Sequence, residues 1–85
     1  MKDREQIKRL IRERLRRDFP EDTVDVADGY QRNIHVTVVS RKFDSMRERD
    51  KQDLLWGLID DAGLDESDKQ LISLILPVSP GEISP

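Results

Sequence analysis

Few residues of this chain carry side chains that could act in catalysis or bind a metal. There is one histidine, His35, and there is no cysteine among the 85 residues. A single imidazole without thiolate partners makes a poor metal or cluster site, so we interpret His35 as an ordinary residue of a β-strand. Ser40 and Ser45 have no histidine placed to activate them, and the four glycines are isolated, so no phosphate-binding glycine-rich loop is present. We therefore expect no enzymatic activity, no metal site and no bound cofactor.

Five acidic residues lie close together in the second half of the chain. They are Asp60, Asp61, Asp65, Glu66 and Asp68. Convergent carboxylates bind hard cations, but an EF-hand loop needs acids at alternate positions and a glycine at the sixth. Because the spacing differs from that pattern, we favour a solvated acidic loop over a cation site.

Basic residues form the other charged group that could bind a ligand. Residues 1–19 contain eight Lys or Arg against four Asp or Glu, whereas the rest of the chain is net acidic. A basic loop that leads into a helix N-terminus can grip phosphates. The candidate nucleic-acid contacts are Arg12, Arg16, Arg41, Lys42, Arg47, Arg49 and Lys51. The simpler alternative is a solvated face, which is the commoner reason for a run of charge.

These side chains must be positioned by elements that the hydrophobic spacing predicts. Apolar residues at three- and four-residue spacings indicate helices, and alternating β-branched residues indicate strands. The predicted elements are a helix over Asp3–Phe19, strands over Thr23–Ala27 and Ile34–Ser40, a helix over Ser45–Ala62, one helical turn over 65–68 and a strand over Leu71–Val78. Asp3 with Gln6 resembles a capping box at the start of the first helix. Ser45 with Glu48 has the same pattern before the second helix.

The last predicted strand is apolar at nearly every position. Alternation divides its side chains between the two sides of the strand. One side has Ile72, Leu74, Leu76 and Val78, and the other has Leu71, Ser73 and Ile75. Nearly continuous apolar character is typical of a strand that is covered on both faces. We therefore expect this strand to be more protected than the first strand, which has the pattern of a short edge strand. In the second helix we expect Trp56 to face the core.

The element order α–β–β–α–(α)–β predicts an α+β fold. The first two strands should form an antiparallel hairpin with a loop of about five or six residues. A crossover helix then brings the last strand into a mixed three-stranded sheet, with the helices on one face. The length suits one domain, which we assign to residues 1–79, followed by a short frayed tail at 80–85. No apolar run reaches bilayer length, so we expect a soluble cytoplasmic protein, monomeric or weakly dimeric through the edge of the first strand.

The chain resembles the BolA family in three segments. Val39, Ser40 and Phe43 are similar to that family's strand ending in Val-Ser-x-x-Phe. Residues 51–55 stand where the family has a basic, His-containing helix start that runs into apolar residues, and residues 74–82 are similar to its last strand and Thr-Pro-x-Glu-type ending. The three segments occur in the family's order, at nearly gapless spacing, across nearly the whole chain.

The resemblance implies a fold similar to the type II KH domain and a role as a small regulatory adaptor. BolA-like proteins typically partner monothiol glutaredoxins, often through a bridging [2Fe–2S] cluster, and some are described as DNA-binding regulators with a stress-related role. The family's cluster ligands are a Cys or His in the hairpin loop and a His at the start of the last strand. Tyr30 and Leu71 stand at these two places, and Gln52 replaces the His of the helix start. We therefore expect a protein partner without a cluster.

The expected partner-binding surface is the strand–helix junction over Ser40–Lys51 together with the hairpin loop. Its candidate residues are Tyr30, Arg41, Lys42, Arg47, Lys51 and Gln52. The alternative function is DNA or RNA binding by the basic set named above. A KH domain also needs a GXXG loop between its helices, but residues 61–66 contain one glycine and are acidic, so contact through that loop is disfavoured.

Overall fold

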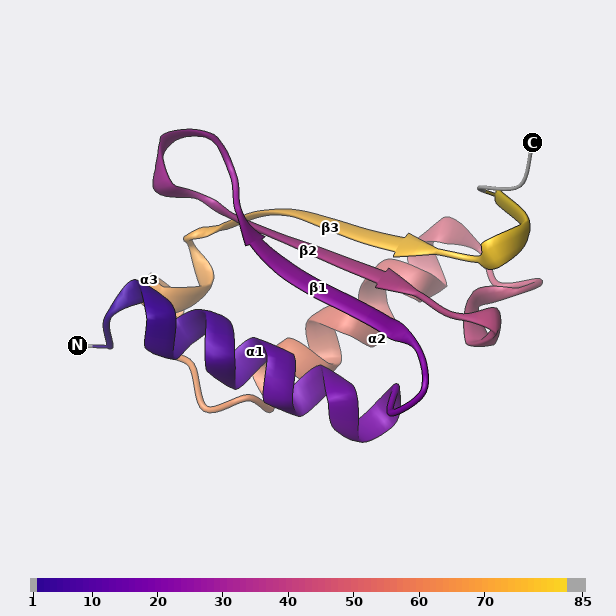
Figure 1. Cartoon of the computed structure of the whole chain (residues 1–85), viewed down its shortest axis with the longest axis horizontal. Helices are drawn as coiled ribbons and strands as arrows, with labels where there is room; N and C mark the ends of the chain where they lie inside the picture. Colours follow the sequence, from indigo (N-terminus) through magenta and orange to yellow (C-terminus); the bar gives the residue numbers. More distant parts are fainter. Residues whose placement is uncertain (1, 83–85) are drawn as a thin grey trace.

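The computed structural model describes residues 2–82 and contains the predicted elements in the predicted order (Figure 1). The helices are α1 (Arg4–Asp18), α2 (Glu48–Asp60) and α3 (Glu66–Lys69). The strands are β1 (Thr23–Asp28), β2 (Ile34–Val39) and β3 (Ile72–Val78). Short 3-10 turns cover Tyr30–Arg32, Arg41–Phe43 and Pro80–Glu82. Residues 83–85 of the expected tail lie outside the described residues, so the boundary at residue 79 stays a prediction.

The three strands form one mixed sheet in the order β1-β2-β3. β1 pairs antiparallel with β2, and β2 pairs parallel with β3, as the hairpin and the crossover predicted. Figure 1 shows α1 and α2 on the same side of the sheet, so the fold has one layer of helices and one layer of strands. The α+β prediction is confirmed, and one face of the sheet has no helix over it.

The expected position of β3 was wrong. β3 is an edge strand like β1, and the central strand is β2. β3 is apolar on both faces because one face packs in the core and the other carries exposed leucines, and not because both faces are covered. Leu74 and Leu76 are 40% and 42% exposed.

A register shift near Ser73 also changes which side chains share a face. Ile34 pairs with Ile72, but the next residue of β2, His35, pairs with Leu74, so Ser73 is an extra residue in β3. Ile72 and Ile75 therefore both face the core, whereas the expected simple alternation placed them on opposite sides.

The core lies between the helices and one face of the sheet. Ile34, Val36 and Val38 of β2 are fully buried at its centre. From the helices, the buried apolar side chains that meet them are Ile7, Ile11, Leu15, Leu55, Leu58 and Ile59. Phe19 and Phe43 pack with ring centroids 5.6 Å apart and close one end of this core. Trp56 is half-buried against it, in agreement with the expectation.

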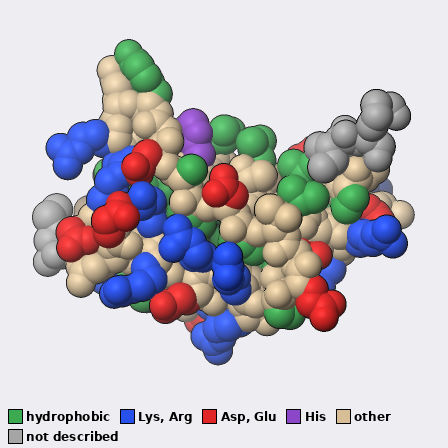
Figure 2. Space-filling view, viewed as in Figure 1, with side chains coloured by type: hydrophobic (Ala, Val, Ile, Leu, Met, Phe, Trp, Pro, Cys, Tyr) green, Lys and Arg blue, Asp and Glu red, His purple; other side chains and the backbone are tan. Residues whose placement is uncertain are grey.

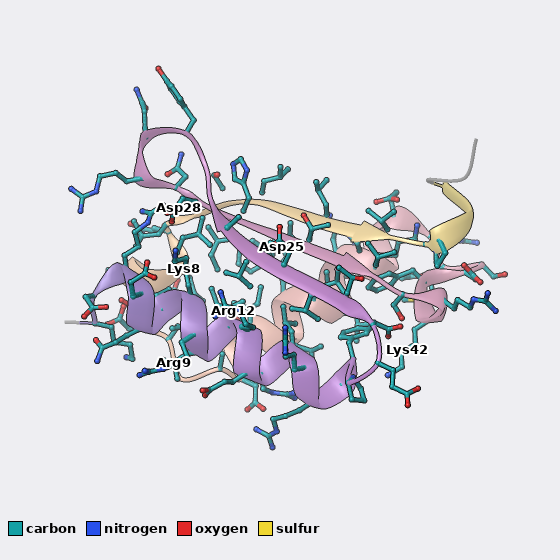
Figure 3. The ribbon with its side chains drawn as sticks, viewed as in Figure 1. Lys8, Arg9, Arg12, Asp25, Asp28 and Lys42 are labelled. Carbon is teal, nitrogen blue, oxygen red and sulfur yellow. The ribbon has the colours of Figure 1, made fainter. Side chains whose placement is uncertain are left out.

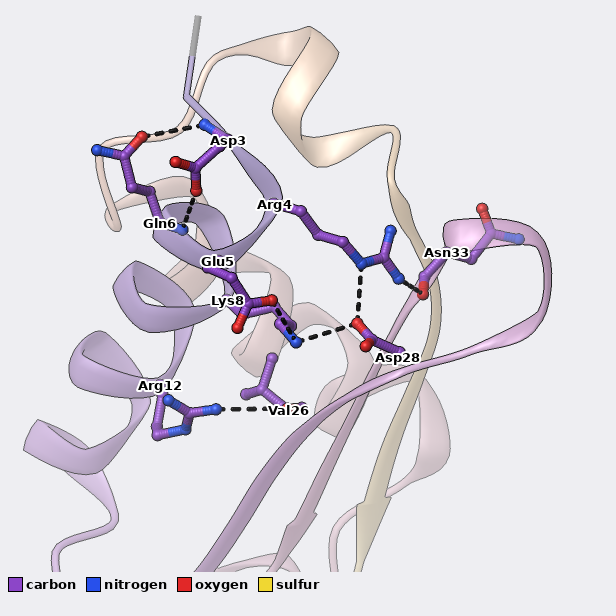
Figure 4. Close-up of polar contacts among 9 residues, drawn as sticks. All are labelled: Asp3, Arg4, Glu5, Gln6, Lys8, Arg12, Val26, Asp28 and Asn33. Atoms are coloured by element: carbon purple, nitrogen blue, oxygen red, sulfur yellow. Dashed lines mark hydrogen bonds and ion pairs between the residues drawn. The ribbon is translucent and has the colours of Figure 1, made fainter.

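Hydrogen bonds and ion pairs connect the N-terminal half of α1 to the hairpin of β1 and β2 (Figure 4). Asp3 and Gln6 form the predicted capping box. Arg4 donates from Nε to Asp28 Oδ1 at 2.8 Å and from Nη2 to the Asn33 carbonyl. Lys8 Nζ lies 3.0 Å from the same Asp28 oxygen. These hydrogen bonds, first that from Arg4 and then that from Lys8, hold the pKa of Asp28 below its ordinary value.

The start of α2 differs from the predicted capping box. The helix begins at Glu48 with Arg47 as its N-cap, and no side chain caps it. Ser45 has a φ of 68°, which is the left-handed region and cannot precede a helix directly as an N-cap does. The buried Phe43 draws residues 41–43 into a 3-10 turn first, and Ser40 Oγ caps that turn by accepting from the Lys42 N–H.

We predict opposite consequences for two neighbouring substitutions in β3. Ile75→Ala should lower the free energy of unfolding by about 2–5 kcal/mol, because it leaves a cavity in the core. Leu76→Ala should change it by less than about 1 kcal/mol, because that side chain faces solvent. Urea denaturation of both variants measures the difference. If Leu76→Ala were the more damaging change, the two residues would lie on the faces opposite to those described.

We predict that Asp28→Asn destabilises the protein at neutral pH and not in acid. A carboxylate whose pKa is lowered by folding stabilises the native state above its unfolded pKa of about 3.9, and that contribution disappears as pH falls through the folded pKa. Urea denaturation of the wild type and the variant at pH 7 and at pH 2 should show a gap that closes in acid. Asp25→Asn is the matched control, since Asp25 forms no ion pair within residues 2–82. A gap that persists unchanged at pH 2 would contradict the role of the charge.

Candidate binding surface

At each outer edge of the sheet, side chains occupy some of the backbone groups that a further strand would need. Arg12 of α1 lies over the outer edge of β1, with Nη2 at 3.5 Å from the Val26 carbonyl oxygen. Figure 3 shows Arg12 between α1 and β1. On the outer edge of β3, Gln52 Nε2 donates to the Ile75 carbonyl at 3.0 Å, and Pro77 has no N–H to offer. Side chains and a proline that occupy edge groups in this way disfavour strand addition.

The face of the sheet that has no helix over it is here called the open face. The strand register arranges its side chains in three rows, which are Ala27–His35–Leu74, Asp25–Thr37–Leu76 and Thr23–Val39–Val78. The residues on β2 are half-buried, since they have neighbours on both sides. Asp25 is the one Asp, Glu, Lys or Arg residue in these rows. Five of the nine side chains on the open face are therefore apolar, and the other four are two threonines, one aspartate and His35.

The large hydrophobic side chains that the described residues expose lie on this side of the molecule. They are Leu74 and Leu76 on the open face and Tyr30 at the tip of the hairpin loop. The Tyr30 side chain is 79% exposed. Figure 2 shows hydrophobic side chains on both sides of the histidine along the upper rim, whereas charged side chains dominate the surface over α1. A grouped set of exposed apolar side chains on a small domain marks an interaction surface more often than single exposed residues do.

The hairpin loop beside the open face is closed by a backbone hydrogen bond between its first and last residues. Its five residues, 29–33, agree with the predicted length. The Gly29 N–H donates to the Asn33 carbonyl, and Gln31 and Arg32 have φ values of 54° and 69°. A Cβ on Gly29 would lie 2.3 Å from His35 Nε2, so the imidazole packs on the glycine backbone. His35 is thus a packing residue that supports the loop, as expected for a sheet histidine.

The predicted partner-binding residues divide into exposed and engaged side chains. Tyr30, Arg41, Lys42 and Arg47 are exposed. Lys42 donates from Nζ to the Asp18 carbonyl and lies 4.8 Å from the centroid of the Phe19 ring. Lys51 is 4% exposed and pairs with Glu48 at 3.2 Å, and Gln52 is tied to β3 as described above. Lys51 and Gln52 therefore serve the fold and are not part of an exposed surface.

The predicted nucleic-acid residues are spread over two places. Arg12 and Arg16 lie on α1. Arg16 is exposed, whereas Arg12 is half-buried and lies over the edge of β1. The others lie where β2 ends and α2 begins, and Arg41, Arg47 and Arg49 are exposed there. The contact of Lys42 with the Asp18 carbonyl brings this segment next to the end of α1.

The acidic cluster is used within the fold. Asp61 pairs with Arg14 at 3.0 Å, and Asp60 pairs with Lys69 at 3.0 Å. Asp65 and Asp68 form a capping box for α3, and the Asp68 backbone N–H is the main cause that lowers the pKa of Asp65. Within residues 2–82, no group of three or more His, Asp or Glu side chains could hold a metal ion.

The positions of the family's cluster ligands do not suit an iron–sulfur cluster. Tyr30 stands at the tip of the hairpin loop. Leu71, which precedes β3, has a hydrocarbon side chain without a donor atom, and its backbone carbonyl accepts from the Ile34 N–H. Iron–sulfur clusters are held by thiolates or imidazoles. His35 offers one imidazole, but it is packed on Gly29.

Sequence reasoning missed Leu74 and Leu76 as surface residues. One signal was available, because proline within a strand pattern is largely confined to edge strands, and Pro77 lies within this one. The register shift at Ser73 had no comparable signal.

No family model matches this chain, and no curated protein matches it. Two solved structures are similar to it. BolA1 from Arabidopsis thaliana aligns over 100% of both chains with a TM-score of 0.68 and 23% sequence identity. A BolA-like hypothetical protein from Rickettsia prowazekii aligns over 84% of this chain and 91% of its own, with a TM-score of 0.62 and 15% identity. The chain therefore has the BolA-like fold that the sequence resemblance implied.

Proposed function

We propose that this protein is a small adaptor that acts by binding another protein and catalyses no reaction. The observation that supports this most is the open face, on which Leu74 and Leu76 of β3 are exposed, and Tyr30 at the tip of the hairpin loop is exposed as well. Keeping two large apolar side chains in water on a small domain costs solubility, and a partner that covers them regains the free energy of their burial.

The partner class that we propose is a monothiol glutaredoxin or a protein like it. This part rests on the BolA resemblance, together with the shared fold. Because Tyr30 and Leu71 replace the ligand residues, the partner would be bound by surface contact without a bridging cluster. We place this action in the cytoplasm, as a regulatory role. Within residues 2–82 no helix is long and apolar enough to cross a membrane.

We predict that the double substitution Leu74→Ser with Leu76→Ser weakens binding of a monothiol glutaredoxin at least tenfold, because buried apolar anchors dominate interface energies. An amide NMR titration of the isotope-labelled protein measures the affinity and the site. Shifts should map to the open face and the hairpin loop.

The matched control is Glu13→Ser with Asp53→Ser, two exposed residues on the helical side of the molecule. This variant should bind as the wild type does. A glutaredoxin that moves no amide signal, or that binds the leucine variant with unchanged affinity, would overturn the proposal.

Nucleic-acid binding is the second candidate, and one observation favours it. The first turn of α2 has no side-chain cap, and the exposed Arg47 and Arg49 lie at that same turn, with Arg41 nearby in the chain. Helix N-termini and arginines both attract phosphates. If this is the function, a short single-stranded oligonucleotide should shift residues 41–49 and the end of α1 at low salt. The shifts should vanish at physiological salt, and a flat response at low salt would remove this candidate.

A further inference from the structure

The open face combines an apolar ridge with a single carboxylate at a fixed separation. Leu74 and Leu76 lie on β3, and Asp25 lies on β1, in the same row as Leu76. Adjacent strands are about 4.8 Å apart, so two strand spacings, or roughly 10 Å, separate the carboxylate from the leucines. Figure 3 shows Asp25 on the side of β1 away from α1.

Asp25 has no partner of opposite charge within the described residues. Lys8 and Arg12 point at β1 from the helix side, where Lys8 pairs with Asp28. Apart from His35, the other members of the rows are Ala, Val, Leu and Thr, so a partner that covers the open face meets one exposed negative charge. A cation of the partner would pair with that charge, and a carboxylate would be repelled.

Arg12, Gln52 and Pro77 occupy groups at the two strand edges and so disfavour strand addition, which favours a partner that contacts the side chains of the open face. An α-helix fits these dimensions. Its diameter of about 10 Å matches the width from β3 to β1. Its residues at i and i+4 lie about 6 Å apart, close to the roughly 6.7 Å between alternate residues of a strand such as Leu74 and Leu76.

We infer that the segment that covers the open face is an amphipathic helix of the partner, with a leucine-type stripe on Leu74 and Leu76 and a basic flank beside Asp25. This inference rests on the proposed function, since it describes the partner of the same face. It adds the secondary structure and the charge of the bound segment.

The test uses two synthetic 15-residue helical peptides with the same leucine stripe. One carries Lys at its flanking positions, and the other carries Gln. Each is titrated into the isotope-labelled protein at physiological salt and followed by amide NMR. The Lys peptide should shift residues 23–27, 35–39 and 74–78. Asp25→Asn should weaken the Lys peptide about two- to fivefold and leave the Gln peptide unchanged, as expected for one exposed ion pair.

Asp53→Asn is the matched control, because it removes an exposed carboxylate from α2 and leaves the open face intact. It should leave both affinities unchanged. The inference is wrong if the Lys peptide shifts the acidic helices α2 and α3 instead, if neither peptide binds, or if Asp25→Asn affects both peptides equally. If neither peptide binds but a glutaredoxin still shifts the amide signals of the open face, the helical-segment inference is wrong and the proposed function is retained. If both fail at the open face, the proposed function falls as well.

Discussion

The alternation of side chains along the central strand β2 is the constraint on which the rest of this structure depends. Ile34, Val36 and Val38 are fully buried beneath the helices, and the residues between them face the other way. A slip of one residue in the pairing would exchange the two sets and place three β-branched side chains in solvent. This strand therefore decides which face of the sheet the helices cover and which face they leave open.

The open face follows from that choice and from two local features of β3. The extra residue at Ser73 keeps both Ile72 and Ile75 in the core, so Leu74 and Leu76 point outward. At the outer edge of the same strand, Gln52 donates to the Ile75 carbonyl and Pro77 has no N–H, which disfavours the addition of a further strand. Exposed leucines on a face that no helix covers are the physical basis of the adaptor function that we propose.

Much of the fold could be predicted because it depends on short-range patterns. The apolar spacing of α1, its capping box at Asp3 and the alternation of β2 all act within a few residues. The position of β3 could not be predicted, because strand order depends on contacts between segments far apart in the chain. The start of α2 was missed because the burial of Phe43, a tertiary contact, overrides the local capping pattern at Ser45. For the same reason, Lys51 and Gln52 have binding-type side chains but are engaged inside the fold.

The most direct test of this account is a measurement of which methyl groups meet water. A soluble gadolinium chelate is added to the methyl-labelled protein, and the relaxation of each methyl signal is measured at low and high protein concentration. If the open face is uncovered, the methyl signals of Leu74 and Leu76 should relax strongly and those of Ile72 and Ile75 should be protected, at both concentrations. Protected leucine methyls in the dilute protein would mean that the face is covered within the chain itself, which would contradict an open binding face.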